Sequence, residues 1–335
     1  TQIEVLKAFK KVIKEEGAAA IYVTHDLAVV AQVADHIVVL YNGEIKEAGP
    51  VETIISKSEH PYTKRLMGAI KPLPKAGLGE SSNHAHMRDA PALEAKSVDA
   101  GYGRDAEGKP KTMVLRDVNV AIERGKTVGI IGESGCGKST LARVFAGLLP
   151  PSDGGLKLDG ESIAPDLRDR SREELRKVQF VYQMADTALN PRQRIKDIIG
   201  RPLEFYGGLT GDAKNRRLLE LLDMVELPPP FAERYPHELS GGQKQRVNLA
   251  RALAADPEVV LCDEVTSALD TIVGANVIEL LKTLRRDTGV SFVFISHDLS
   301  TVASFADEIV VLYAGRVAEQ GPTDKVLSPP YHPYT

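Results

Sequence analysis

The residues in this sequence best suited to chemistry form a glycine-rich loop that ends in a lysine and a serine. Residues 132–139 read GESGCGKS, which fits the pattern G-x4-G-K-[ST]. Glycines let backbone N–H groups wrap around phosphates, Lys138 suits the β- and γ-phosphates, and Ser139 suits Mg²⁺. The pattern therefore predicts a site for the phosphates of a nucleoside triphosphate.

A pair of carboxylates further along the chain could complete such a site. The apolar stretch 259–262 runs directly into Asp263 and Glu264. Asp263 suits a contact to Mg²⁺, and Glu264 suits a general base that polarises the attacking water. Acidic residues rarely end a buried strand without a role.

Short apolar strands and helices must position these groups. Strands are predicted at Val128–Ile131, Val259–Cys262 and Val290–Ile295, with helices over Lys138–Leu148 and from near Asp298. Apolar strands that alternate with helices indicate a parallel sheet covered on both faces. The fold class is therefore predicted to be α/β.

Two other stretches differ in composition from this pattern. Residues 165–250 are richer in charge and helix-forming residues, and they predict an inserted helical subdomain. Residues 71–91 combine Pro, Gly, Ser and His without periodicity and predict an inter-domain linker. His84 and His86 lie in that linker, and we interpret them as solvated side chains and not as metal ligands.

An internal repeat organises the chain. Residues 22–63 and 294–335 match at a constant offset without a gap, which aligns His25 with His297. The simplest interpretation is two copies of one domain, of which the first lacks its N-terminal part and exposes apolar surface and strand edges. Both copies contain the tetrapeptide HPYT, at 60–63 and 332–335, for which we predict packing and no chemistry.

Composition excludes several other classes of protein. The chain has 335 residues, 43% of them hydrophobic, and a net charge of −4, which gives no electrostatic footprint for nucleic acid. No apolar run approaches the roughly 18 residues of a membrane span, so a link to a membrane would need partner proteins. Two cysteines cannot form a secreted disulfide framework, which favours a reducing cytosol.

A further motif carries a family resemblance. Residues 239–243 read LSGGQ before a helical run, and this resembles the signature motif of ABC ATPases. By the same resemblance Gln183 looks like the Q-loop glutamine, Asp270 like the D-loop aspartate and His297 like the switch histidine. Tyr102 is the best candidate for the aromatic residue that stacks on adenine.

The resemblance implies the P-loop NTPase fold of ABC ATPases, with a mostly parallel sheet, N-terminal antiparallel strands and an inserted helical subdomain. Residues 1–70 would be the C-terminal part of a first ABC ATPase domain, with His25 as a switch histidine that has no phosphate loop of its own. Residues 92–335 would be a second ABC ATPase domain. Its signature residues would act on the ATP of an opposing domain, so the chain alone is expected to be a weak ATPase.

The cofactors implied are ATP and Mg²⁺. The predicted catalytic residues are Glu264, His297 and Gln183. The predicted metal ligands are Ser139, Gln183 and Asp263. The predicted nucleotide-binding residues are Tyr102, Gly132, Glu133, Ser134, Gly135, Cys136, Gly137, Lys138, Ser139, Thr140, Ser240, Gly241, Gly242, Gln243 and Asp270.

Several segments point to one class within this family. The stretches YQMADTALNPR at 182–192, YPHE at 235–238 and HPYT at 332–335 resemble ATPase subunits of oligopeptide/dipeptide ABC importers. This implies a peripheral protein at the cytoplasmic face of the inner or plasma membrane. Its partners would be transmembrane permease subunits, a second nucleotide-binding domain and, indirectly, an extracytoplasmic solute-binding protein, but no nucleic acid.

Two alternative functions stay open at this point. One is a soluble ABC ATPase of a multi-subunit enzyme, such as the phosphonate carbon–phosphorus lyase system. The other is a module that dimerises on ATP without hydrolysing it, against which Glu264 and His297 argue. The sequence does not identify the cargo, and peptides, nickel, opines and glutathione all fit the resemblance.

Overall fold

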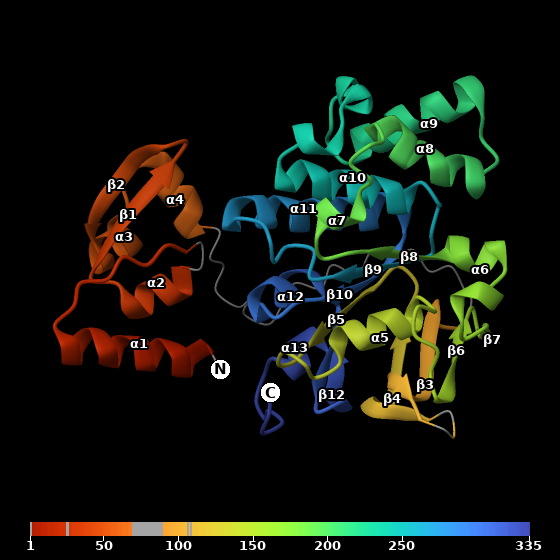
Figure 1. Cartoon of the computed structure of the whole chain (residues 1–335), viewed down its shortest axis with the longest axis horizontal. Coiled ribbons are helices and arrows are strands. Elements are labelled where there is room, and N and C mark those ends of the chain that lie inside the picture. Colours follow the sequence, from red (N-terminus) through yellow and green to blue (C-terminus); the bar gives the residue numbers. More distant parts are fainter. Residues whose placement is uncertain (1, 25–26, 69–89, 106, 108) are drawn as a thin grey trace. The chain divides into compact units, whose positions relative to one another are not determined.

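A computed structural model describes residues 2–24, 27–68, 90–105, 107 and 109–335. The chain divides into two compact units (Figure 1). The N-terminal unit comprises Thr1–Pro72 together with the short segment Asp270–Ala275, and the larger unit comprises Leu73–Leu269 and Asn276–Thr335. Most of the predicted linker 71–91, with His84 and His86, lies outside the described residues, as does His25.

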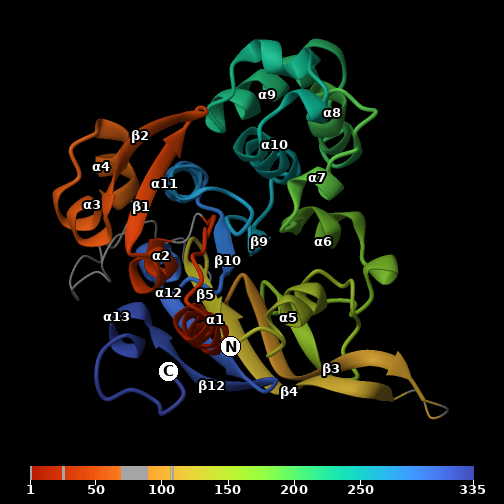
Figure 2. The same ribbon diagram turned by 60° about the vertical axis from the view of Figure 1, so that its left-hand side comes forward.

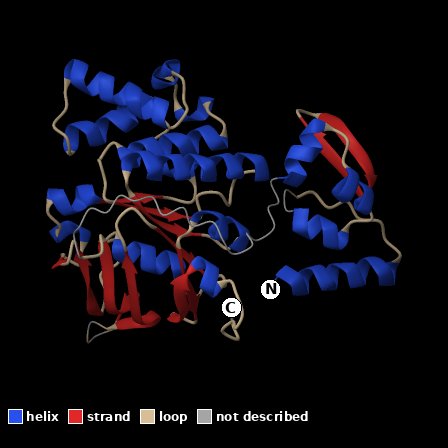
Figure 3. Cartoon of the chain, turned by 180° about the vertical axis from the view of Figure 1, so that it is seen from behind, coloured by secondary structure: helices blue, strands red, loops and turns tan. Residues whose placement is uncertain are grey.

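The N-terminal unit is a β-hairpin with helices packed beside it (Figure 3). Its strands pair antiparallel from His36 opposite Pro50, with a bulge after Val39. A small core forms from Ile37, Val39 and Ile54. The elements are α1 (Gln2–Glu16), α2 (Leu27–Val33), β1 (His36–Tyr41), β2 (Glu44–Pro50), α3 (Val51–Lys57) and α4 (Pro61–Gly68).

Part of this unit differs from its repeat partner in the larger unit. Residues 19–23 align with 291–295, a strand in the larger unit, yet they form neither helix nor strand. Ile21 is 95% exposed and Val23 is 91% exposed. A strand needs a neighbour to bond its backbone, and the strands that flank 291–295 have no counterparts in the described part of this unit. The predicted exposed apolar surface is therefore present here.

The larger unit is built on a six-stranded sheet of order β12-β11-β5-β10-β9-β8. All neighbouring pairs are parallel except β11 with β12, which is antiparallel. The strands are β5 (Thr127–Ile131), β8 (Val178–Val181), β9 (Val259–Asp263), β10 (Ser291–Ile295), β11 (Glu308–Tyr313) and β12 (Arg316–Pro322). The predicted mostly parallel sheet is confirmed.

Side chains of the central strands alternate between two cores. Val260 and Cys262 of β9 face one core, while Val259 and Leu261 face the other. This alternation follows from the two-residue period of a strand. Apolar residues on both faces explain why these stretches show no polar alternation in the sequence.

One core lies between the parallel sheet and a four-stranded antiparallel sheet of order β4-β3-β6-β7. Helix α5 (Lys138–Phe145) contacts strands of both sheets (Figure 2). Gly147 has a left-handed φ of 73° and ends this helix sooner than expected, because glycine adopts that conformation without strain. The antiparallel strands are β3 (Leu93–Arg104), β4 (Pro110–Ile122), β6 (Asp153–Leu158) and β7 (Glu161–Ser162).

The other core lies under the helices that follow β8, β9 and β10. Four of them, α7 to α10, occupy the chain between β8 and β9, and the last of them extends three residues beyond the predicted helical region 165–250. The helices not yet named are α6 (Arg172–Lys177), α7 (Ala185–Ala188), α8 (Ile195–Phe205), α9 (Gly211–Met224), α10 (Gly241–Leu253), α11 (Thr271–Thr288), α12 (Leu299–Phe305) and α13 (Thr323–Val326), with 3-10 turns at Leu167–Asp169, Pro229–Glu233 and Pro236–Glu238.

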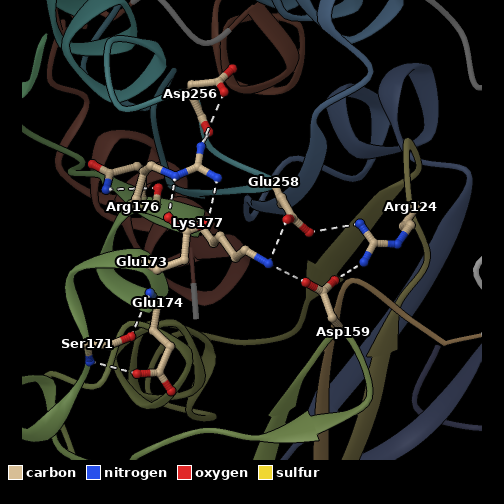
Figure 4. A network of polar contacts seen from close by, with 10 residues as sticks. Arg124, Asp159, Ser171, Glu173, Glu174, Arg176, Lys177, Asp256 and Glu258 are labelled. Carbon is tan, nitrogen blue, oxygen red and sulfur yellow. Dashed lines mark hydrogen bonds and ion pairs between the residues drawn. The ribbon is translucent and has the colours of Figure 1, made fainter. Parts of the chain in front are cut away.

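An ionic network ties together the starts of three parallel strands (Figure 4). Lys177, before β8, lies 2.5 Å from Asp159 and 2.9 Å from Glu258, before β9. Arg124, before β5, lies 2.8 Å from Glu258 and also pairs with Asp159. Burial opposes ionisation of Glu258, but the hydrogen bonds from Lys177 and Arg124 hold its pKa below the usual value. The network therefore fixes the edge of the sheet opposite the carboxyl ends of the strands.

Within the described residues, no helix combines the length and the apolar character needed to cross a bilayer.

Candidate functional site

The predicted site residues follow the carboxyl ends of four neighbouring strands. The glycine-rich loop follows β5, Gln183 follows β8, Glu264 follows β9 and His297 follows β10. Because β5, β10, β9 and β8 are adjacent and parallel, their carboxyl ends meet at one edge of the sheet. This topology brings together groups that lie far apart in the sequence.

The loop between β5 and α5 needs glycine at two closely packed positions. Gly132 has a φ of 147°, and a Cβ there would lie 2.2 Å from the carbonyl oxygen of Leu312. Gly137 has a φ of 113°, and a Cβ there would lie 2.7 Å from Leu115 Cδ2. At Gly135, in contrast, an added Cβ would meet nothing within 4 Å. The loop is thus packed tightly on one side and open at Gly135.

Lys138 is the first residue of α5 and closes the loop on itself. Its Nζ donates to the carbonyl oxygens of Gly132, at 2.8 Å, and Glu133, at 2.9 Å. The side chain is buried, so the ammonium group stays close to the loop backbone. The first N–H groups of α5 have no partner within the helix, and together with Lys138 they favour an anion at this point.

A hydroxyl and a carboxylate suited to a magnesium ion meet beside the loop. Ser139 Oγ donates to Asp263 Oδ1 at 3.0 Å. Burial raises the pKa of Asp263, and the charge of Glu264 raises it further, while the hydrogen bond from Ser139 opposes both effects. A cation would favour the ionised form, and oxygen ligands are those that Mg²⁺ prefers. The donor set therefore fits this ion.

Glu264 lies at the centre of a polar cluster. Its Oε2 accepts from Gln183 Nε2 at 2.9 Å, and its Oε1 lies 3.5 Å from His297 Nδ1. Gln183 Nε2 also donates to Ser267 Oγ at 3.1 Å. Glu264 thus contacts both of the other predicted catalytic residues, and it directly follows the predicted metal ligand Asp263 in the sequence.

The backbone of Glu264 is held in a conformation that is uncommon for glutamate. Its φ is 48°, in the left-handed region. Its N–H donates to the carbonyl oxygen of Ile295 at 3.0 Å, and its own carbonyl accepts from Ser267 Oγ at 2.9 Å. Residues in such conformations cluster at functional sites, where the surroundings enforce them.

Tyr102 on β3 contacts α5, the helix that follows the glycine-rich loop. Its hydroxyl lies 3.2 Å from Thr140 Oγ1 and accepts from Arg143 Nη1 at 3.0 Å. The side chain is 37% exposed. The structure therefore places Tyr102 beside α5, and its stacking on adenine stays a prediction.

The signature turn is an N-terminal cap of α10. Ser240 Oγ accepts from the Gln243 N–H at 3.4 Å, and Gln243 Oε1 accepts from the Ser240 N–H at 3.0 Å. Ser240 and Gly241 are exposed. Helix α10 packs into the core on the face of the sheet opposite α5. The turn therefore belongs to a different layer from the loop, and Gly241, which is exposed, and Gly242, which is half-buried, begin a helix whose N-terminus favours an anion.

Asp270 and two further residues complete the description of the site. Asp270 Oδ1 accepts from the Val273 N–H at 3.0 Å, which caps the start of α11. Sequence reasoning assigned no role to Ser267 or Arg143, which hold Gln183 and Tyr102 in place. Residues 267–270 read SALD, so the resemblance that identified Asp270 could also have indicated Ser267. The contact of Arg143 with Tyr102 arises from the packing of α5 against β3, which the sequence does not show.

Cys136 in the loop gives a testable readout of nucleotide binding. It is 6% exposed, and burial raises the pKa of its thiol, an effect that the charge of Lys138 partly opposes. Only the thiolate reacts with maleimides, so we expect slow labelling at pH 7 that accelerates about tenfold per pH unit below the pKa. We also expect MgATP to slow labelling, and labelling to abolish nucleotide binding.

The measurement is the rate of N-ethylmaleimide incorporation at Cys136, followed by mass spectrometry of peptides. Cys262 is an internal control, because it is fully buried and its pKa is also raised. It should remain unlabelled in the folded chain, with or without nucleotide. Equal rates at Cys136 with and without MgATP would show that nucleotide does not cover this loop.

Two family models match the chain. The model described as ABC transporter matches residues 115–267. The model described as Oligopeptide/dipeptide transporter, C-terminal region, matches residues 47–90. The first match contains the loop, Gln183, the signature turn and Glu264. The second begins at Glu47 in the N-terminal unit and includes its HPYT tetrapeptide.

Relatives and solved structures agree with these matches. The glutathione import ATP-binding protein GsiA of Escherichia coli K12 is 35% identical over 368 aligned residues, which cover 100% of this chain and 57% of that protein. GsiA of Shigella flexneri is 36% identical with the same coverage. The chain thus spans a little over half the length of these relatives.

Two solved structures share the fold. The ATP-binding cassette MJ0796, in a dimeric post-hydrolysis state bound to ADP and Pi, is 34% identical, with a TM-score of 0.59, and the alignment covers 69% of this chain and 98% of that one. The chain cbiO1 from Clostridium perfringens, part of the ABC transporter complex cbiONQ, is 28% identical with a TM-score of 0.62, and the alignment covers 71% and 91% of the two chains. These findings confirm the predicted fold and the family resemblance: the chain belongs to the ABC transporter family, as an ATP-binding cassette protein.

Proposed function

We propose that this chain binds and hydrolyses ATP, and that the resulting cycle powers import of peptides or similar small solutes. The observation that carries the proposal is the contact of Glu264 with both Gln183 and His297, directly beside the pair Ser139 and Asp263. A base, a metal-ligand pair and a phosphate loop are the parts that phosphoryl transfer to water requires.

Each residue has a role that follows from its position. The loop amides and Lys138 bind the β- and γ-phosphates of ATP. Glu264 accepts the proton of the attacking water as the bond between the β,γ-bridging oxygen and the γ-phosphorus breaks. His297, whose Nδ1 faces Glu264, orients this water and the γ-phosphate, and Gln183 keeps the carboxylate of Glu264 in place.

Ser139 and Asp263 would hold Mg²⁺, with Gln183 as the third ligand proposed from the sequence. When bound, this ion would neutralise charge on the phosphate oxygens. The contribution of the chain is to keep the two oxygen ligands next to each other at the end of β9 and the start of α5.

Residues 240–243 would act on ATP held by the loop of another domain. The exposed position of Ser240 and Gly241 at the start of α10 supports this, because a helix N-terminus can bind a phosphate that a facing domain presents. ATP between two such domains would favour a closed state, and hydrolysis would release it. Asp270, exposed at the start of α11, would lie at the same interface.

The partners of this cycle would be transmembrane permease subunits, a second nucleotide-binding domain and, through the permease, an extracytoplasmic solute-binding protein. The chain would work as a peripheral protein on the cytoplasmic side of the membrane. The matched relatives, which are named for glutathione import, support a peptide-like cargo. We further propose that 1–70 and 92–335 derive from two cassette domains in tandem, since each carries the same C-terminal elements.

The soluble enzyme complex is the weaker alternative, because the matched relatives are import proteins and one family model describes an oligopeptide/dipeptide transporter. Affinity purification of the tagged full chain from its native cells separates the two functions. Recovery of a polytopic permease supports the importer. Recovery of soluble enzyme subunits without a permease would overturn it.

A further inference from the structure

The HPYT tetrapeptide makes the same hydrogen-bonded turn at its histidine in both units, although residues 61–63 begin α4 and residues 333–335 form no helix. In the larger unit His332 Nδ1 accepts from the Tyr334 N–H at 3.2 Å. In the N-terminal unit His60 Nδ1 accepts from the Tyr62 N–H at 3.1 Å. The turn therefore depends on local sequence, because it forms in two different surroundings.

In both units the tyrosine of the tetrapeptide packs its ring against the tyrosine that ends an earlier strand, β11 or β1. The ring centroids of Tyr334 and Tyr313 lie 4.3 Å apart. Those of Tyr62 and Tyr41 lie 4.2 Å apart. Each ring therefore lies directly against the tyrosine that ends the strand. Up to this point the tetrapeptide does what packing alone predicts.

The hydroxyl group of Tyr334 reaches the phosphate loop. In the larger unit the hydroxyl of Tyr334 accepts from the backbone N–H of Glu133, in the phosphate loop, at 2.9 Å. The carbonyl oxygen of the same Glu133 accepts from Lys138 Nζ. Glu133 is thus held on one side by Tyr334 and on the other by the lysine that faces the phosphates.

The hairpin that carries Tyr313 also supports this loop. The Gly315 N–H, in the turn between β11 and β12, donates to the carbonyl oxygen of Cys136 at 3.0 Å. Leu312 lies so close to Gly132 that no side chain fits there. The tyrosine pair therefore joins the C-terminal turn to a hairpin that already contacts the loop at two points.

We propose that Tyr334 is a positioning residue for ATP, whose hydroxyl fixes the Glu133 peptide and thereby keeps the phosphate loop in its binding conformation. A loop that is already ordered loses less conformational freedom on binding, which increases affinity. Tyr334 contacts neither Glu264 nor the metal-ligand pair, so it acts through the loop. This inference rests on the proposed binding of ATP.

The decisive variant is Tyr334→Phe, which removes the hydroxyl and keeps the ring on Tyr313. Tyr62→Phe is a matched control, because it makes the same change in the same turn of the other unit. Equilibrium titration of the full chain with a fluorescent ATP analogue and Mg²⁺ should show a Kd about three- to tenfold higher for Tyr334→Phe, the size of one net hydrogen bond. Tyr62→Phe should bind like the unchanged chain.

Two further readouts separate positioning from a general structural role. Because Tyr334 does not touch the reacting atoms, the rate at saturating ATP should be unchanged while KM rises. Burial raises the pKa of Tyr334, so the phenol stays neutral and the Kd ratio should be constant between about pH 6.5 and 8.5.

Two results would contradict the proposed role of Tyr334, and a third would contradict the proposed binding of ATP itself. Equal Kd values for the two variants would overturn the role of Tyr334, as would a lower Tm of the nucleotide-free chain without a change in Kd. If the unchanged chain itself fails to bind the analogue, the proposed ATP binding fails and not merely the role of Tyr334.

Discussion

Glu264→Gln is expected to lower the rate of phosphate release by about 10²–10⁴-fold while ATP still binds. Glutamine has the shape of glutamate and can still accept from Gln183, but it cannot take a proton from water. Affinity for MgATP should therefore stay within about threefold, since hydrogen bonds to this position persist. Phosphate release over a series of protein concentrations, together with the Kd of a fluorescent ATP analogue, measures both effects.

Glu220→Gln is a suitable control for this change. Glu220 is an exposed residue of α9 that pairs with Arg217, away from the carboxyl ends of the strands. It should leave both turnover and affinity unchanged. If Glu264→Gln hydrolysed ATP as fast as the unchanged chain, Glu264 would not be the base, because glutamine cannot accept the proton of the water.

Lys138→Met is expected to weaken MgATP binding about 100-fold, with only a small loss of folding stability. The ammonium group proposed to bind the phosphates disappears, and hydrogen bonds to charged groups are stronger than those between neutral groups. The carbonyl oxygens of Gly132 and Glu133 lose a donor, which is unfavourable. The buried charge disappears as well, and methionine fills a similar volume, so the Tm should fall by no more than a few degrees. Titration with the fluorescent analogue and thermal unfolding without nucleotide measure the two quantities.

Lys126→Met tests whether the effect depends on position. Lys126 directly precedes β5, at the end of the strand opposite the loop, and makes partly exposed ion pairs with Glu123 and Glu308. Surface pairs contribute little, so its affinity and stability should change little. If Lys126→Met and Lys138→Met bound ATP equally well, the loop would not be the phosphate site.

Much of the site could be predicted because its residues lie next to short apolar strands. The predicted strand Val259–Cys262 lies in β9, Asp263 is the last residue of that strand, and the loop and Glu264 follow strands as expected. The sequence does not reveal which strands are neighbours, because β5, β10, β9 and β8 pair across long separations in an order unlike that of the chain. Only that order explains why Gln183 meets Glu264.

Contacts made by side chains across elements were the least predictable feature. The hydrogen bond of Tyr334 to Glu133 joins residues 201 positions apart. Nothing in the spacing of HPYT indicates such a partner, since the same tetrapeptide at 60–63 forms the same turn. The prediction that this motif serves packing alone followed from the sequence, but it missed the hydrogen bond to the phosphate loop.

The exposed segment 19–23, which forms neither helix nor strand, is a site at which this protein could aggregate in storage. Its residues, AAIYV, are uncharged and contain no proline, and two of the three larger ones are almost wholly in contact with solvent. Short segments of this kind are the ones that recruit identical segments from other molecules into cross-β stacks. Because such stacking requires several molecules to meet, we expect storage concentration to limit the useful lifetime of a preparation in which this segment stays uncovered.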